Sequence, residues 1–178
     1  MRTLLTLTFL MVLSVGYGQK RQTNFSYFKL CIVNDKDEVL LVEYKGIWEP
    51  IGRRYNEPRT IRETLNHMAE EVGLEINHHH LGAMVNQYYN GGKYPIIFNF
   101  WRADYVKGTP KVPADCTDIK WVPIKEALKL VPFESMVMVM EQYLVKDKTK
   151  VWCASIDVNN QEWPHSYVTN IREDFYPL

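Results

Sequence analysis

Residues 48–74 decide the fold, and they read WEPIGRRYNEPRTIRETLNHMAEEVGL. The second half of this stretch predicts a helix over residues 60–72, because apolar side chains recur there at spacings of three and four. Thr60 is the expected N-cap, and Glu63 completes a capping box with it. Gly73 follows the last periodic residue and is the expected C-terminal stop of the helix.

The opposite face of this predicted helix is charged. At 100° per residue, Glu63, His67, Glu70 and Glu71 fall within about a quarter turn of one another. Three carboxylates and an imidazole repel one another or compete for protons unless solvent or a cation relieves the crowding. The polar face is therefore the first candidate for a functional site.

Short elements are expected on both sides of residues 48–74. Residues 28–33 and 39–42 predict a β-hairpin around a turn at 34–37, and residues 81–89 and 94–105 predict a second hairpin around Asn90 and Gly91. Residues 45–58 are expected to be irregular, and 159–178 have no clear pattern. The remaining elements are two strands and two helices, at 119–122 and 150–158, and at 124–130 and 134–145. This order predicts a mixed α/β domain whose helices cover a mixed sheet.

The composition is that of a globular protein. The chain has 178 residues, of which 46% are hydrophobic, and its 21 basic and 21 acidic residues balance to a net charge of +0. This length suits one domain with at most a short appendage. The charge balance gives no reason to expect binding to nucleic acid or to an anionic membrane surface.

The first 18 residues resemble a secretory signal peptide. Arg2 supplies a positive charge, twelve uncharged and mostly apolar residues follow, and small residues stand at the expected cleavage site after Gly18. Twelve residues are too few to span the hydrocarbon core, which needs about 20 in a helix, so no stable membrane span is expected after cleavage. We expect export to the periplasm or the medium. The alternative is a cytoplasmic protein in which this segment is a buried first strand or helix.

The domain organisation expected is a signal peptide over residues 1–18, a main domain over 19–148, and an extension over 149–178 with one strand. The three cysteines are Cys31, Cys116 and Cys153. Cys31 lies in an apolar run and is expected in the core. An exported protein can pair two of the three, and the pairing stays open.

Residues 52–74 resemble the Nudix box, which is glycine, five residues, glutamate, seven residues, and then Arg-Glu-apolar-x-Glu-Glu-x-Gly-apolar. Six positions are in register: Gly52, Met68, Glu70, Glu71, Gly73 and Leu74. Three positions depart from the pattern, because Pro58, Asn66 and His67 stand where the family has Glu, Arg and Glu. We therefore describe the stretch as a degenerate Nudix box.

The resemblance implies a Nudix-type α/β/α sandwich with a mixed sheet. It also implies a pyrophosphohydrolase that uses Mg²⁺ or Mn²⁺ and acts on small nucleoside diphosphate derivatives. The residues it suggests for catalysis are Glu70, Glu71 and Asp118. Those it suggests for metal binding are Glu70, Glu71, Glu63 and His67. Those suggested for substrate binding are Arg53, Arg54, Gly52 and Trp48.

Two functions stay open at this stage. The first is an active hydrolase with a rebuilt metal site, in which other side chains compensate for the lost positions. The candidates are Glu57, Glu63, His67, and Asp115 or Asp118 in the loop before Trp121. The second is a catalytically inactive exported binding module that keeps the cleft. Simpler roles also exist for these side chains: Glu63 as a helix cap, and Trp48, Tyr88 and Trp101 as packing residues instead of stacking partners for a base. His78, His79 and His80 stand at the start of a predicted strand. Consecutive side chains on a strand point to opposite faces, so the three cannot chelate one ion together.

Overall fold

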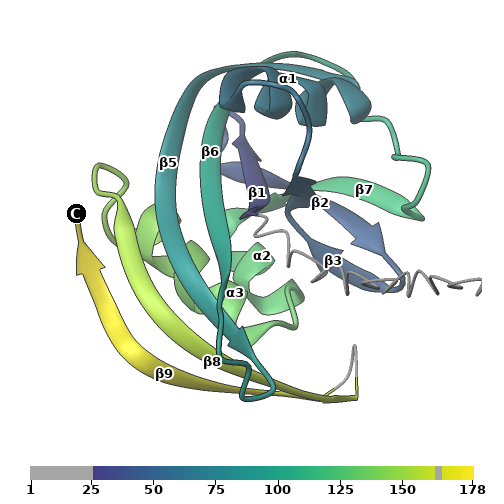
Figure 1. Ribbon diagram of the computed structural model, residues 1–178. Coiled ribbons are helices and arrows are strands. Elements are labelled where there is room, and N and C mark those ends of the chain that lie inside the picture. The colour runs from purple at the N-terminus through teal and green to yellow at the C-terminus, as the bar shows by residue number, and fades with distance from the viewer. Residues whose placement is uncertain (1–25, 163–165) are drawn as a thin grey trace, which may run out of the picture.

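A computed structural model describes residues 26–162 and 166–178 of the chain (Figure 1). The predicted signal peptide, residues 1–18, lies outside the described residues. The helices are α1 (Ile61–Glu71), α2 (Ile124–Leu130), α3 (Glu134–Met140) and the π-helix η1 (Glu141–Lys146). The strands are β1 (Ser26–Val33), β2 (Glu38–Tyr44), β3 (Ile47–Glu49), β4 (Ile51–Tyr55), β5 (Leu74–Tyr89), β6 (Ile96–Gly108), β7 (Asp118–Pro123), β8 (Trp152–Glu162) and β9 (Ser166–Pro177). Within the described ranges, no helix is long and apolar enough to cross a membrane.

The strands form one mixed sheet in the order β3-β2-β1-β6-β5-β8-β9, while β4 pairs with β1 and β7 pairs with β2. The β1–β6 and β5–β8 pairs are parallel, and the other pairs are antiparallel. β1 is buried on both faces, because Phe28 and Leu30 face one hydrophobic core and Cys31 faces the other. A strand covered on both faces reads as a nearly continuous apolar run, which is what this segment shows.

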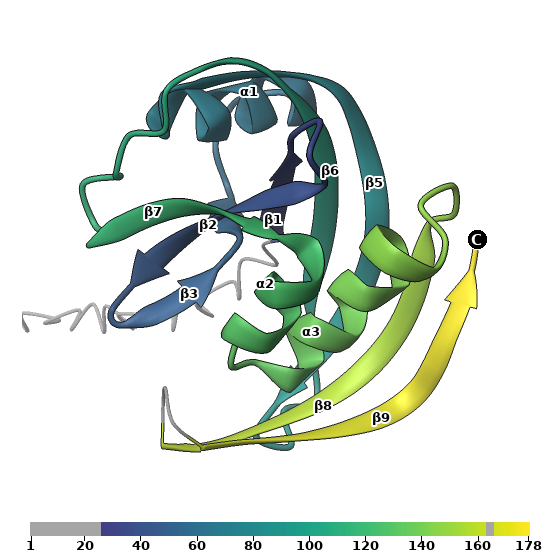
Figure 2. The ribbon, with the colours of Figure 1, turned by 180° about the vertical axis from the view of Figure 1, so that it is seen from behind.

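Helices cover the sheet on two sides. α1 contributes Leu65 and Met68 to one core. α2, α3 and η1 contribute Ala127, Val139 and Tyr143 to the other core, on the side that Figure 2 brings forward. The predicted fold class, an α/β fold with a mixed sheet and helices on both sides, is confirmed.

The predicted signals at the ends of α1 are also confirmed. The Thr60 hydroxyl accepts a hydrogen bond from the Glu63 backbone N–H at 3.3 Å, and the Glu63 carboxylate accepts one from the Thr60 backbone N–H at 2.8 Å. Gly73 follows the helix with φ +77°, a left-handed conformation that glycine adopts without strain. The expected hairpin turn after β5 is present, with positive φ at Asn90 and Gly91.

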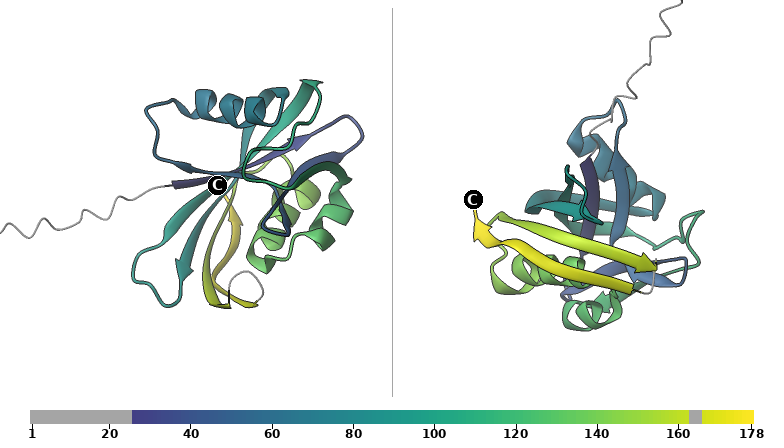
Figure 3. Two further views of the ribbon diagram at one scale, coloured as in Figure 1. Left: turned by 90° about the vertical axis from the view of Figure 1, so that its right-hand side faces the viewer. Right: turned by 60° about the horizontal axis from the view of Figure 1, so that its bottom comes forward.

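Three segments differ from the sequence-based expectation. Residues 45–58, expected to be irregular, contain β3 and β4, which pair with β2 and β1 across the fold. β5 begins at Leu74, seven residues before the expected start, and the irregular register around His78 hides the alternation that would reveal it. Residues 166–177, which had no assignment, form β9. β8 and β9 lie side by side as a C-terminal hairpin, and β8 extends the main sheet beside β5 (Figure 3).

The expected helix over residues 134–145 is confirmed as α3, and it continues as a π-helix. The last part of this helix packs tightly on β5, where the Tyr143 ring lies over Gly82. A Cβ atom at Gly82 would lie 2.2 Å from Cδ2 of Tyr143. The Tyr143 hydroxyl donates a hydrogen bond to the Cys31 sulfur at 2.9 Å. All three cysteines are free, and Cys31 and Cys153 are buried.

Candidate functional site

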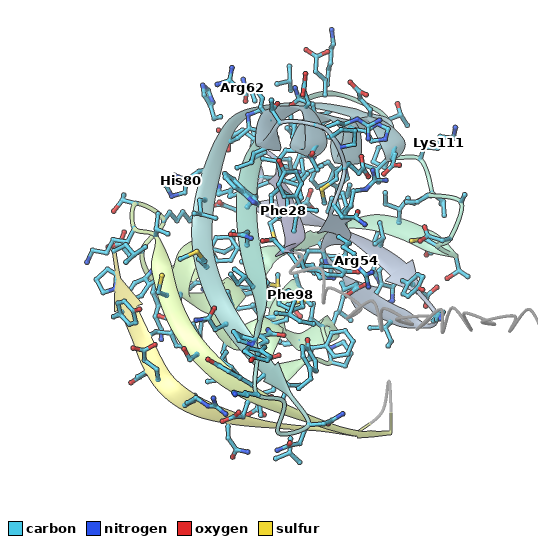
Figure 4. The ribbon with its side chains drawn as sticks, viewed as in Figure 1. Phe28, Arg54, Arg62, His80, Phe98 and Lys111 are labelled. Atoms are coloured by element: carbon cyan, nitrogen blue, oxygen red, sulfur yellow. The ribbon has the colours of Figure 1, made fainter. Side chains whose placement is uncertain are left out.

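The box-like stretch, residues 52–74, borders a cleft of about 660 Å³. The cleft lies between the strands β1 to β4, the C-terminal end of α1 and the loop from β6 to β7. Its charged lining residues come from all of these regions: Glu49, Arg53, Glu71, Lys111 and Asp115. The loop is held against α1, because the Lys111 backbone N–H donates to the Val72 carbonyl at 2.8 Å. Figure 4 shows Arg62 and Lys111 at opposite ends of α1. We call this space the charged cleft.

Arg53 is the central side chain of the charged cleft. Its Nη1 donates to Glu57 Oε1 at 2.8 Å, and its Nη2 donates to Glu71 Oε1 at 2.5 Å. Arg59 pairs with the other oxygen of Glu57. One guanidinium therefore joins β4, the following loop and the end of α1.

A buried ion pair forms the adjoining wall. Lys29 is 4% exposed, although it lies in an otherwise apolar strand. Its Nζ donates to Glu49 Oε2 at 2.6 Å. Gly52 leaves room for this ammonium group, because a Cβ atom there would lie 2.6 Å from the Lys29 Nζ. The glycine of the box-like stretch is thus explained by a close side-chain approach, since its backbone has no positive φ.

A second cavity of about 310 Å³ adjoins the charged cleft, and we call it the aromatic cavity. The two share Tyr27, Tyr44 and Glu49 in their walls. The other rings around the aromatic cavity are Tyr89, Phe98 and Phe133. Arg54, which Figure 4 labels, lines it. Arg53 lines the charged cleft, because neighbouring side chains on a strand point to opposite faces.

The structure does not gather the four predicted metal ligands. The Glu63 carboxylate is engaged at the first turn of α1 by Thr60. Glu70 lies seven residues further along, which is about 10 Å along the helix axis. His67 contacts both glutamates of the last turn, with Nε2 at 3.5 Å from Glu71 and Nδ1 at 3.8 Å from Glu70.

This donor set does not fit a divalent cation of the Nudix type. Mg²⁺ usually takes six oxygen ligands in an octahedron, some of them carboxylates and some waters. Among the described residues, no three His, Cys, Asp or Glu side chains form a group that could hold a metal ion. Glu71 is already paired with Arg53, and the side chain of Glu70 is 72% exposed.

Asp118 and the aromatic residues that were considered for stacking lie outside both spaces. Asp118 is exposed at the start of β7, where its carboxylate accepts from the Ile119 backbone N–H at 2.7 Å. Trp48 lies under the Lys120 ammonium, which is 3.8 Å from the ring centroid. Tyr88 stacks with Arg172, and Trp101 packs near Phe28. These three aromatic residues line neither the charged cleft nor the aromatic cavity.

Sequence reasoning missed the Lys29–Glu49 pair, Lys111, and Tyr27 and Tyr44 of the shared wall. One signal was available, because a single lysine inside an apolar strand indicates a buried partner. The partner itself is 20 residues away and could not be named. Asp115, in the loop before β7, lines the cleft where Asp118 was expected to act. Beside it, burial and the Asp115 carboxylate raise the pKa of the Cys116 thiol to about 11.

Comparisons with known proteins agree with this architecture. No protein-family model matches the chain, and no curated protein matches it. Among solved structures, the chain is similar to a MutT protein from Bacillus halodurans, with a TM-score of 0.67 and 17% identity over 82% of this chain and 97% of that chain. It is also similar to a NUDIX hydrolase from Nitrosomonas europaea, with a TM-score of 0.62 and 11% identity over 78% and 81% of the two chains. An ADP-ribose pyrophosphatase from Streptococcus suis aligns with a TM-score of 0.54 and 12% identity over 70% of this chain and 95% of that chain.

At these identities the likeness shows the fold alone. The chain has the fold of the Nudix hydrolases, and a fold does not by itself establish a function.

Proposed function

We propose that the protein binds a nucleoside diphosphate-linked small molecule, with the charged cleft and the aromatic cavity acting as one site. The observation that carries this proposal is that two chemically unlike spaces share Tyr27, Tyr44 and Glu49 as a common wall. Aromatic walls suit a flat ring such as a base. Arg53 and Lys111 supply the donors that phosphate groups prefer. A nucleotide-type ligand combines both features, and such ligands are what the Nudix fold suggests.

We further propose that residues 52–74 are a degenerate Nudix box and that the site serves binding. The positions that the family uses for Glu, Arg and Glu hold Pro58, Asn66 and His67. The box-like carboxylate that lines the cleft, Glu71, is already committed to Arg53. Losing one catalytic carboxylate costs an enzyme orders of magnitude in rate, and here two glutamate positions are replaced.

The second candidate function is a divalent-metal pyrophosphohydrolase. It is favoured by the placement of Glu71 and Asp115 in the walls of the same cleft. A carboxylate that lines a substrate cleft is a candidate general base toward water. In this reading Asp115, which the sequence suggested together with Asp118, acts as this base.

A panel of nucleoside diphosphate-linked compounds separates the two functions. Binding is measured by titration calorimetry, and turnover is measured by chromatography of the products with Mg²⁺, Mn²⁺ or Zn²⁺. We expect at least one compound to bind and none to be hydrolysed. Hydrolysis that requires a metal would favour the second candidate. A folded protein that binds no compound of the panel would contradict the proposal.

Two pairs of variants locate the ligand. Lys111→Ala is expected to weaken binding about tenfold by removing a cation beside the phosphates. Lys107→Ala is the matched control, because Lys107 is exposed and pairs with Glu75 outside the cleft. Tyr44→Ala is expected to weaken binding about tenfold by removing part of the shared aromatic wall. Its control is Tyr94→Ala, at an exposed tyrosine that lines neither space. Equal effects in a variant and its control would contradict this placement.

We also propose that the protein is exported and begins at Gln19 after cleavage. The support is the order of charge, apolar run and small residues in the first 18 positions. The intact mass of the protein recovered from its native host tests this. A soluble protein that retains residues 1–18 would contradict export.

A further inference from the structure

We propose that Arg53 is a built-in cation that takes the place of a divalent metal ion between Glu57 and Glu71. As a result, the wild-type protein does not take up Mg²⁺ or Mn²⁺ at these carboxylates. The inference concerns the same cleft as the proposed function, but its test uses the metal alone. The two proposals can therefore fail independently.

The first support is the geometry of the guanidinium group. Two of its nitrogen atoms reach two carboxylates that come from different elements, at 2.8 Å to Glu57 and 2.5 Å to Glu71. A planar guanidinium matches carboxylates well and holds its charge at any physiological pH. Joining two carboxylates from a loop and a helix end is the structural task that a bridging metal ion performs in a carboxylate site.

The second support is the local charge balance. Glu57 pairs with both Arg53 and Arg59, and Glu71 pairs with Arg53. Two guanidinium groups thus accompany two carboxylates. A divalent ion placed here would be repelled by the guanidinium that the carboxylates already hold, and it would have to displace that group to gain its ligands.

The third support is the lack of replacement ligands. Glu63 caps the start of α1, and Glu70 points to solvent with a side chain that is 72% exposed. His67 faces Glu71 at 3.5 Å, but imidazole suits Zn²⁺ or Ni²⁺ better than Mg²⁺. No group of three candidate ligands occurs in residues 26–162 and 166–178.

Arg53 also keeps access to the charged cleft. It is one of the lining residues, and its side chain is 23% exposed. Its hydrogen bonds to Glu57 and Glu71 use two of the five N–H groups of the guanidinium. The same cation that neutralises the carboxylates is therefore placed to donate to an anionic group in the cleft, without a metal ion as intermediary.

Titration calorimetry with MnCl₂ tests the proposal on the full chain. Arg53→Gln removes the cation and leaves both carboxylates uncompensated, so we expect this variant to bind Mn²⁺ at least about tenfold more tightly than the wild type. Adding Glu71→Gln to Arg53→Gln should abolish the gain. Arg54→Gln is the matched control, because it removes the same charge one residue away, from a side chain that lines the aromatic cavity. It should leave Mn²⁺ affinity unchanged.

Equal Mn²⁺ affinity in the wild type and a folded Arg53→Gln variant would overturn the proposal, and so would an equal gain in Arg54→Gln. If Arg53→Gln does not fold, the wild type alone decides the question. Paramagnetic broadening of amide signals on addition of Mn²⁺ should spare Glu57 and Glu71. Selective broadening of both signals would overturn the proposal.

Discussion

The Lys29–Glu49 pair allows a sharp test of how the site is supported. The pair lies in the wall between the charged cleft and the aromatic cavity, with Lys29 and Glu49 side chains 5% and 17% exposed. Glu49→Gln keeps the size of the side chain but leaves the buried ammonium without its counter-charge. Removing one partner of a buried pair costs about 3–5 kcal/mol. Because the Glu49 side is partly open, we expect the lower end, about 3 kcal/mol.

Two further variants of this ion pair should behave differently. Lys29→Met leaves a carboxylate that water can reach from the cleft, so the expected loss of unfolding free energy is smaller, about 1 kcal/mol. Lys29→Met combined with Glu49→Leu removes both charges, and apolar replacement of a buried pair is often neutral or stabilising. The double variant should therefore lie within about 1 kcal/mol of the wild type.

Urea unfolding followed by tryptophan fluorescence measures these changes. With a slope of about 2 kcal/mol per molar urea, a loss of 3 kcal/mol lowers the midpoint by about 1.5 M. Glu75→Gln is the matched control, because the Lys107–Glu75 pair is solvent-exposed and an exposed pair contributes about 0–1 kcal/mol. The reasoning is refuted if the double variant lowers the midpoint as much as Glu49→Gln does, or if Glu49→Gln and Glu75→Gln shift the midpoint equally.

Three further predictions concern other parts of the molecule. Gly82→Ala should lower the free energy of unfolding by about 3 kcal/mol or more, because its Cβ would enter the buried Tyr143 ring. An unchanged urea midpoint would contradict this packing. Hydrogen bonds from the Thr60 backbone and hydroxyl lower the pKa of Glu63 from 4.5, so its stabilising effect is present above pH 4.5 and is lost as the pH falls through the lowered pKa. Glu63→Gln should therefore lower the urea midpoint at pH 7 but not well below pH 4, whereas an equal shift at both pH values would argue against this linkage. Burial and the Asp115 charge raise the pKa of Cys116 to about 11, so alkylation of its thiol by iodoacetamide should be slow at pH 8 and accelerate toward pH 11. Asp115→Asn should make alkylation at pH 8 faster. A rate that reaches its plateau below pH 9 would contradict the raised pKa.

Local patterns in the sequence were enough to predict much of the fold. The spacing of Leu65, Met68 and Val72 placed α1, and Thr60 with Gly73 marked its ends, because helix faces and caps depend on residues only a few positions apart. Turn residues likewise placed the hairpin after β5. The register of residues 52–74 led to the Nudix fold, and it suggested Gly52, Arg53 and Glu71 as site residues, which the structure places in the lining of the charged cleft.

Only the tertiary structure decided how those residues are used. Arg53 meets Glu71 across 18 residues, and Lys29 meets Glu49 across 20, because β4 pairs with β1 and brings the end of α1 beside them. Lys111 and Asp115 join the cleft through a loop whose path has no local pattern. The sequence specifies which charged side chains are present, but an ion pair forms only where the fold brings its two charges together. For this reason the sequence could suggest carboxylates for a metal, whereas the structure alone shows that one of them, Glu71, is held by Arg53.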